Sequence, residues 1–323
     1  MATGTNENNN IVKPFLKWAG GKTQLLSVIE KKAVAFLQSR ESVVYVEPFI
    51  GSGAVLFFLL RNYKSFLKKA IINDINLDLV TCYKVVRDQP QEFIKELADL
   101  EQQFFSFATE PERKEFFLAS RTAFNQIGQS PVRKSALMLF LNKTCFNGLY
   151  RVNSKGHFNV PFGRYKTPTI CNKALILADS EALQHTEILH GDFQNTLAFV
   201  NENSFVYLDP PYKPISTTAA FNTYAKEGFF DSDQIRLKNY CDTVHGAGAF
   251  FLLSNSDTAS SPQQEDFFDN LYQAYTIERV KAKRAINSNG QARGEISELL
   301  ISNDIILTKS AAVNEKLVVE TKL

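Results

Sequence analysis

The chain has 323 residues, 44% of them hydrophobic and 12% aromatic, and a formal net charge of +2. These values are typical of a soluble globular protein that can form one large domain plus an insertion. No apolar run reaches the roughly 18 to 20 residues of a membrane span, and the start "MATGTNENNN" lacks the pattern of a signal peptide. We therefore expect a cytoplasmic protein.

Charge is unevenly distributed along the chain. The stretch from Phe116 to Ala178 holds nine of the 36 basic residues and none of the 34 acidic ones. Aromatic residues lie among these cations in "CFNGLYRVNSKGHFNVPFGRYK", a mixture that suits stacking on bases and contact with phosphates. The pattern favours a polyanionic partner, and the alternative is a solvated basic face. The four cysteines and four histidines show no metal-ligand spacing, so we expect no metal.

Strand-like and helix-like segments alternate in the first half. "VVYVEPFIGSGAVLFFLLRNY" (43–63) predicts a strand, a turn at Gly51 and Gly53, and a helix. "AIINDIN" (70–76) predicts a second strand that ends at Asp74. The segment that follows is helical to about Leu141, with a break at Pro90.

The second half begins with a predicted β-hairpin, "LYRVNSKGHFNV" (149–160), with Gly156 in its turn. Strands are predicted in "TEILHGDF" (186–193), "SFVYLDPPY" (204–212) and "AFFLLSNSD" (249–257), and an antiparallel pair in "TIERVKAKRAI" (276–286) and "EISELLISND" (295–304). The sequence thus predicts an α/β sheet interrupted by a basic, mainly helical insertion. The predicted parts are a catalytic domain at 11–86 and 179–307, a target-recognition domain at 87–178, and tails at 1–10 and 308–323.

Two glycine-containing segments suggest ligand contacts. Gly51 and Gly53 follow a strand, and Asp74 ends the next one, an arrangement in which such an acid binds ribose hydroxyls. Leu56 replaces the last glycine of GxGxxG, which disfavours a dinucleotide but not an adenosyl group; an ordinary strand-to-helix turn stays open. The "GKT" at 21–23 lacks the upstream glycine of a phosphate-binding loop, because Leu16 stands there.

The strand at 204–208 runs into "DPPY", Asp209 to Tyr212. Pro210 forces Asp209 into an extended conformation, and the two prolines contribute no N–H groups. The turn therefore presents a carboxylate and a carbonyl as acceptors, next to an aromatic ring. A strand-ending turn explains the prolines only. The amino group and flat ring of adenine would explain all four residues.

The motifs "FLKWAGGK", "EPFIGSGAV", "NDIN", "NGLYRVNSKGHFNVPFGRYK", "GDF" and "DPPY", in this order, closely resemble the Dam-type (D12 class) DNA adenine N6-methyltransferases. The resemblance runs from about Phe15 to Asn303. It implies a Rossmann-like, seven-stranded fold that uses S-adenosylmethionine, with a helical target-recognition insertion. The matching cofactor positions are Trp18, Lys22, Asp74, Asp209, Gly51, Gly53, Asp192 and Phe193.

The resemblance also implies methyl transfer to adenine N6 of duplex DNA, in GATC, after the base is flipped out of the helix. The catalytic turn would be Asp209, Pro210, Pro211 and Tyr212. Arg151 would read a guanine, and Phe146 with Asn147 would wedge into the duplex. The remaining DNA contacts would come from Leu149 and Pro161 at a thymine methyl, Lys17 at the first guanine, and Arg164 at a phosphate.

Two alternatives remain open at this stage. Methylation of cytosine N4 poses the same chemical problem and uses similar turns, and a DNA-binding protein can keep this fold without activity. The expected partner is double-stranded DNA, with a cognate restriction endonuclease encoded nearby as a further expectation and no obligate protein partner. The segment "KAKRAINSNGQARG" (281–294) resembles a family loop close to the active site and DNA.

Overall fold

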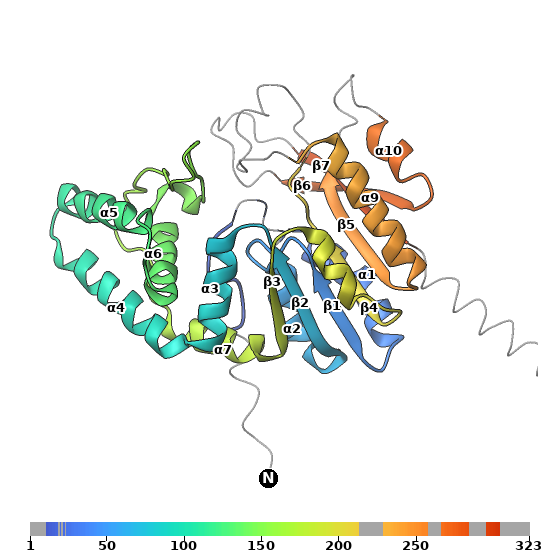
Figure 1. Ribbon diagram of the computed structural model, residues 1–323, viewed down its shortest axis with the longest axis horizontal. Helices are drawn as coiled ribbons and strands as arrows, with labels where there is room; N and C mark the ends of the chain where they lie inside the picture. Colours follow the sequence, from blue (N-terminus) through green and yellow to red (C-terminus); the bar gives the residue numbers. More distant parts are fainter. Residues whose placement is uncertain are drawn as a thin grey trace, which may run out of the picture. The chain divides into compact units, whose positions relative to one another are not determined.

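The computed structural model describes residues 11–18, 20, 22, 24–212, 229–257, 266–283 and 295–303. In this part of the chain seven strands form one mixed sheet, in the order β3-β2-β1-β4-β5-β7-β6 (Figure 1). The strands are β1 (Val43–Glu47), β2 (Leu67–Asp74), β3 (Thr186–His190), β4 (Ser204–Leu208), β5 (Phe250–Ser256), β6 (Thr276–Lys283) and β7 (Glu295–Ser302). The predicted α/β, seven-stranded fold is confirmed.

The parallel strands at the centre of the sheet are buried. β4 pairs in parallel with β1 and with β5, and every residue of β4 and β5 is buried. Continuous apolar runs such as "SFVYL" are typical of parallel strands covered on both faces. β7 is antiparallel to β5 and β6. The antiparallel pair predicted from the sequence is thereby confirmed.

Two compact units divide the chain: unit 1 comprises Met1–Thr23, Ile50–Lys64 and Ile72–Phe193, and unit 2 comprises Gln24–Phe49, Ser65–Ile71 and Gln194–Leu323. The predicted catalytic and target-recognition domains were defined by function, whereas these units are defined by compactness. The predicted domain limits therefore stay a prediction.

Unit 1 is rich in helices. Its helix α6 packs against α3, α4 and α5, which Figure 1 shows together with α7. Pro90 occupies the first turn of α4, where a missing N–H costs nothing, and it separates α4 from α3 as predicted. The helices are α2 (Ala54–Asn62), α3 (Leu77–Asp88), α4 (Pro90–Ser106), α5 (Glu110–Phe124), α6 (Pro131–Thr144) and α7 (Lys173–Ala182), with 3-10 turns η3 (Phe146–Gly148) and η4 (Leu183–His185).

Unit 2 contains most of the sheet. Stacked Phe36, Phe205 and Phe250 join α1 to β4 and β5. Its helices are α1 (Leu26–Gln38), α9 (Asp231–Gly246) and α10 (Phe267–Leu271); two 3-10 turns, η2 (Lys64–Phe66) and η5 (Phe193–Phe199), begin at its borders with unit 1. No helix in the described ranges is long and apolar enough to cross a membrane.

Candidate active site and DNA interface

Two glycines shape the loop that follows β1, here called the glycine loop (Ile50–Gly53). Gly51 and Gly53 have φ values of 47° and 70°, in the left-handed region that glycine adopts without steric cost. A Cβ added at Gly51 would lie 3.0 Å from Trp18 Cδ1, and one added at Gly53 would lie 2.7 Å from the Tyr83 hydroxyl. Conformation and space therefore both require these glycines, and the predicted glycine turn is confirmed.

Asp74, at the end of β2, is fixed by backbone donors. The Gly51 N–H donates to its Oδ2 at 3.2 Å, and the Asn76 N–H donates to its Oδ1 at 2.9 Å. Burial raises the pKa of this carboxyl, and these N–H groups partly oppose the rise. A carboxylate oxygen accepts more than one hydrogen bond, so both can also accept from hydroxyls. A fixed carboxylate beside a loop whose two glycines lack Cβ atoms fits an adenosyl group with its ribose.

The "GDF" segment and Trp18 adjoin this carboxylate within unit 1. The Gly191 N–H donates to the Asp74 carbonyl at 3.1 Å, and the Asn73 side-chain amide donates to the Gly191 carbonyl at 2.9 Å. Asp192 and the buried Phe193 therefore begin directly beside the end of β2. The Trp18 ring packs on Gly51. Contacts thus connect Trp18, Gly51 and Asp74 in unit 1, and Lys22, another predicted cofactor residue of this unit, is buried.

The DPPY turn (Asp209–Tyr212) leaves the end of β4 in unit 2. The Ser254 hydroxyl, on β5, donates to Asp209 Oδ1 at 3.2 Å. The Tyr212 hydroxyl donates to Glu298 Oε2, on β7, at 2.8 Å, which fixes the orientation of the ring. Burial and the neighbouring Asp209 and Glu298 carboxylates raise the pKa of Tyr212, so its hydroxyl stays protonated. Side chains on β5 and β7 therefore hold both ends of the turn.

The basic segment after α6, here called the recognition segment (Cys145–Lys166), is folded back on itself. Antiparallel bridges join Cys145 to Phe162 and Val152 to Phe158. The Gly156 N–H donates to the Asn153 carbonyl at 2.8 Å, which closes the predicted hairpin turn. This hairpin is confirmed.

The tip at Phe146 and Asn147 projects from this segment. Phe146 is 51% exposed, and its N–H donates to the Pro161 carbonyl at 2.9 Å. Asn147 has a φ of 56°, which is uncommon for a residue other than glycine but more tolerable for asparagine. An exposed ring on a fixed backbone has the form of a wedge.

Arg151 is exposed on the hairpin and already oriented. Its Nε donates to Asn159 Oδ1 at 2.7 Å, and its Nη2 donates to the Asn159 carbonyl at 3.2 Å. A guanidinium has five N–H donors, so others remain for a base edge. Arg164 has a φ of 56° and lies 3.5 Å from Glu110, whereas Leu149 is half-buried.

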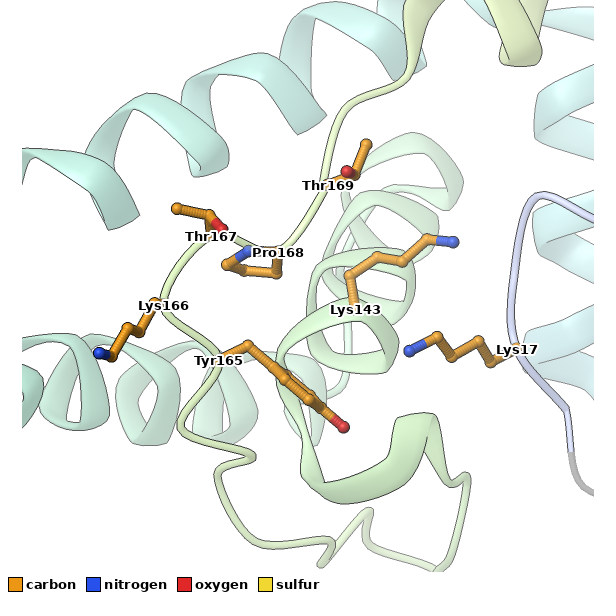
Figure 2. Close-up of a pocket in the computed structure, with 7 residues that line it drawn as sticks. All are labelled: Lys17, Lys143, Tyr165, Lys166, Thr167, Pro168 and Thr169. Atoms are coloured by element: carbon orange, nitrogen blue, oxygen red, sulfur yellow. The ribbon is translucent and has the colours of Figure 1, made fainter. Parts of the chain in front are cut away.

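A cationic pocket of about 380 Å³ lies in unit 1 (Figure 2). Lys17 and Lys143 extend into the same space from the N-terminal segment and from α6, while Lys166 points the other way. Burial, together with the charges of Lys17 and Lys13, lowers the pKa of Lys143 to about 8. The lining residues are Lys17, Lys143, Tyr165, Lys166, Thr167, Pro168 and Thr169.

Comparisons with known proteins show the family of this chain. The sequence model of the D12 class N6 adenine-specific DNA methyltransferases matches residues 18–286. The chain belongs to this family. It is 48% identical to Type II methyltransferase M.MjaIII of Methanocaldococcus jannaschii, over 90% of this chain and 99% of the relative. It is 37% identical to Type II methyltransferase M1.LlaDCHI of Lactococcus lactis, over 92% and 97%, and 34% identical to the DNA adenine methylase of Escherichia coli, over 89% and 94%.

Membership in the D12 class confirms the predicted enzyme activity. The chain is an adenine-specific DNA methyltransferase, S-adenosylmethionine is its methyl donor, and DNA is its substrate. Adenine specificity removes the cytosine N4 alternative, and enzymatic membership removes the catalytically silent one. The roles of individual site residues stay predictions. The tails at 1–10 and 308–323 and residues 284–294 of the predicted active-site loop lie outside the described residues.

Sequence reasoning about this D12 class enzyme missed several supporting residues. Ser254 and Glu298 bind the DPPY turn from strands distant in sequence, and no local motif marks them. Lys143 was visible as one cation of the acid-free stretch, but only the fold shows that it faces Lys17. No group of three or more His, Cys, Asp or Glu residues suited to a metal occurs among the residues that the structure describes.

Proposed function

We propose that this enzyme methylates N6 of adenine within GATC in duplex DNA, after flipping the adenine out of the helix. The observation that carries the proposal is the DPPY turn, in which Asp209 is held by Ser254 and Tyr212 by Glu298. An enzyme gains most from groups placed before the substrate arrives. The order of motifs around the turn supports GATC as the site.

The amino group of adenine is a poor nucleophile, because its lone pair is delocalised into the ring. In this proposal the Asp209 carboxylate and the Pro210 carbonyl accept hydrogen bonds from its two N–H groups. These bonds favour a pyramidal nitrogen whose lone pair points at the methyl group. Pro210 and Pro211 have no N–H groups that would compete for these acceptors. The Tyr212 ring stacks on the flipped base, and the bond to Glu298 sets its angle. S-adenosylmethionine, when bound, would supply an electrophilic methyl group and leave as S-adenosylhomocysteine, and the methylated nitrogen would lose one proton to water.

For the cofactor we assign Asp74 to the ribose hydroxyls, because its carboxylate is already oriented by two backbone donors. Gly51 and Gly53 let the backbone approach the methionine portion closely. Asp192 and Phe193 lie beside the adenine of the cofactor. We assign Trp18, Lys22 and Asp209 to the remaining contacts.

For the DNA we assign Arg151 to a guanine, since its guanidinium is exposed and held by Asn159. Arginine commonly donates two hydrogen bonds to guanine O6 and N7 in the major groove. Phe146 with Asn147 wedges into the duplex. Leu149 and Pro161 touch a thymine methyl, Lys17 contacts the first guanine, and Arg164 contacts a phosphate.

The cationic pocket also supports a contact with the DNA backbone. Lys143 and Lys17 repel one another, and the repulsion helps to depress the pKa of Lys143. An anion between them would relieve this repulsion, and a DNA phosphate is the anion that the substrate supplies. We therefore assign Lys143 to a phosphate.

The proposal is tested by incubating the purified chain with S-adenosylmethionine and a mixed-sequence duplex, then mapping each modified base. We expect N6-methyladenine in GATC alone. The same modification in another sequence would reject GATC, and absence of N6-methyladenine would reject the reaction.

Base flipping is tested by replacing the target adenine with 2-aminopurine, whose fluorescence is quenched by stacking. We expect emission to rise when the enzyme binds the GATC duplex, and not when 2-aminopurine stands outside the site. Equal emission from both duplexes would reject flipping.

The relatives' names support two biological settings. Two are named Type II methyltransferases, which favours a restriction endonuclease encoded nearby, and others are named DNA adenine methylases. Sequencing of the genes beside this one distinguishes the two settings. In either setting we propose action on DNA in the cytoplasm.

A further inference from the structure

We propose that Tyr150 couples cofactor binding to recognition of the DNA sequence. This inference rests on the proposed function, in which Trp18 and Asp74 meet the cofactor and Arg151 reads a guanine. Tyr150 is a positioning residue in this account: it contacts both sets of residues and neither ligand.

The first link is the ring of Tyr150. It stacks on Trp18 with ring centroids 5.2 Å apart and an angle of 25° between the planes. Trp18 in turn packs so closely on Gly51 that a Cβ there would lie 3.0 Å from its ring. A ligand that binds against Trp18 and the glycine loop therefore contacts the Trp18 ring, which already stacks on Tyr150 of the recognition segment.

The second link is the hydroxyl of Tyr150, which donates to Asp78 Oδ2 at 2.9 Å. Asp78 lies in the first turn of α3, immediately after the Asp74–Asn76 turn. Lys134, on α6, lies 3.6 Å from the other Asp78 oxygen and donates to the Phe124 carbonyl at 2.6 Å. Lys134 thus holds Asp78 in place. Through Asp78, Tyr150 is connected to the end of β2 where Asp74 lies.

The third link is the chain itself. Tyr150 and Arg151 are adjacent in the arm of the hairpin that leads to the bridge between Val152 and Phe158. Tyr150 is half-buried, and its ring lies 5.7 Å from Phe158, whereas Arg151 is exposed. The Asn159 N–H donates to the Arg151 carbonyl at 3.0 Å and joins the two arms of the hairpin. A displacement of Tyr150 therefore moves Arg151.

Coupling of this kind is reciprocal between two ligands. Cognate DNA should tighten the binding of the cofactor product S-adenosylhomocysteine, and S-adenosylhomocysteine should tighten the binding of cognate DNA by the same factor. Typical coupling between sites changes affinity by about 5-fold or more. A duplex with one recognition guanine replaced should produce a smaller factor.

The experiment measures the Kd of S-adenosylhomocysteine by calorimetry, with the full chain alone, with the duplex that it methylates, and with that duplex after replacement of one guanine. The coupling factor is the ratio of the Kd without DNA to the Kd with DNA. We expect about 5-fold or more for the wild type with its own duplex. Tyr150→Phe keeps the stack and loses the hydrogen bond, so its factor should fall by about half or more. Tyr150→Leu loses both links, and its factor should approach one.

A matched control is Tyr275→Phe, which removes another tyrosine–aspartate hydrogen bond, the one from Tyr275 to Asp242 at 2.6 Å in unit 2. Its coupling factor should equal that of the wild type. Trp18 is the one tryptophan of the chain, so tryptophan emission reports the stack directly. The emission should shift to longer wavelength in Tyr150→Leu and stay unshifted in Tyr150→Phe.

Unchanged coupling in folded Tyr150→Phe and Tyr150→Leu would overturn the inference, as would a wild-type factor of one. If Tyr150→Leu does not fold, Tyr150→Phe decides alone. The duplex is the one found by mapping the methylated base, so a recognition sequence other than GATC leaves this test intact. Failure of the proposed function appears separately, as wrong or absent methylation by the wild type.

Discussion

The DPPY turn and the recognition segment hold their functional side chains in different ways. Asp209 directly follows a strand that is buried over its whole length and paired on both sides, with β1 and with β5. The recognition segment contains only two isolated bridges, at Cys145 and at Val152. Sheet hydrogen bonds fix the strand that leads into the first region, whereas the second depends on local backbone hydrogen bonds and on side chains of neighbouring helices.

Those side chains come mainly from α5 and the turn after it. The Asn125 amide exchanges two hydrogen bonds with the Phe158 backbone, at 2.8 and 3.0 Å. Arg121 donates to the Val160 carbonyl at 3.2 Å, and Arg113 donates to the Lys166 carbonyl at 3.0 Å. Under the proposed function, the base contacts of this segment should be changeable without disturbing the sheet. We therefore expect that mutation can remove the methyl-transfer step and leave the DNA-sequence preference in place.

Asp209→Ala should have a larger effect on the enzyme than any other substitution considered below. Removing an acceptor placed for the transition state should lower the methyl-transfer rate by about 100- to 1,000-fold or more. Single-turnover methylation with labelled S-adenosylmethionine measures the rate. Asp209→Asn keeps one acceptor oxygen and should be affected less than the alanine variant. A near-normal rate for Asp209→Ala would remove this residue from the chemistry.

The local elements of this comparison were predictable from the sequence. Apolar runs predicted the strand that ends at Asp74 and the strand that leads into Asp209, and Gly156 marked the hairpin turn. Contacts between distant segments were not predictable, because no local pattern encodes them. The bond from Tyr150 to Asp78 spans 72 positions, and the bond from Tyr212 to Glu298 spans 86. The helical insertion was predicted as basic, but only the fold shows that Lys143 and Lys17 line the same pocket.

Arg151→Ala should alter the base preference of the recognition segment. Loss of a bidentate guanine contact should reduce discrimination at one base pair by about 1 to 3 kcal/mol. The ratio of kcat/KM values for the GATC duplex and a duplex with that guanine replaced measures the discrimination. Lys155→Ala changes another cation of the hairpin and should leave the ratio unaltered. If Arg151→Ala keeps the wild-type ratio, Arg151 does not read a base.

The smallest expected effect concerns pH and the cationic pocket. Lys143 has a pKa lowered to about 8 and faces Lys17, Lys13 and Asp179; burial also raises the pKa of Asp179 to about 8. Lys143 carries its charge below that pH and loses it above, while Asp179 gains a negative charge. Both changes weaken phosphate binding, so duplex affinity should fall severalfold as pH rises through about 8, as measured by fluorescence anisotropy.

Variants of Lys143 separate these two groups. Lys143→Arg keeps its charge, and any pH dependence that remains reports Asp179. Lys143→Gln should bind more weakly at neutral pH and lower the slope of log affinity against log salt by about 0.9, the loss of one phosphate contact. An unchanged salt slope in Lys143→Gln would exclude the phosphate contact.

Separation of chemistry from sequence choice is tested most directly by the DNA-binding preference of Asp209→Ala. The measurement compares the Kd of this variant for the GATC duplex with its Kd for a duplex in which the guanine read by Arg151 is replaced. The account predicts the same ratio of the two Kd values as in the wild type, together with the loss of methyl transfer. A folded Asp209→Ala variant that no longer prefers GATC would contradict it.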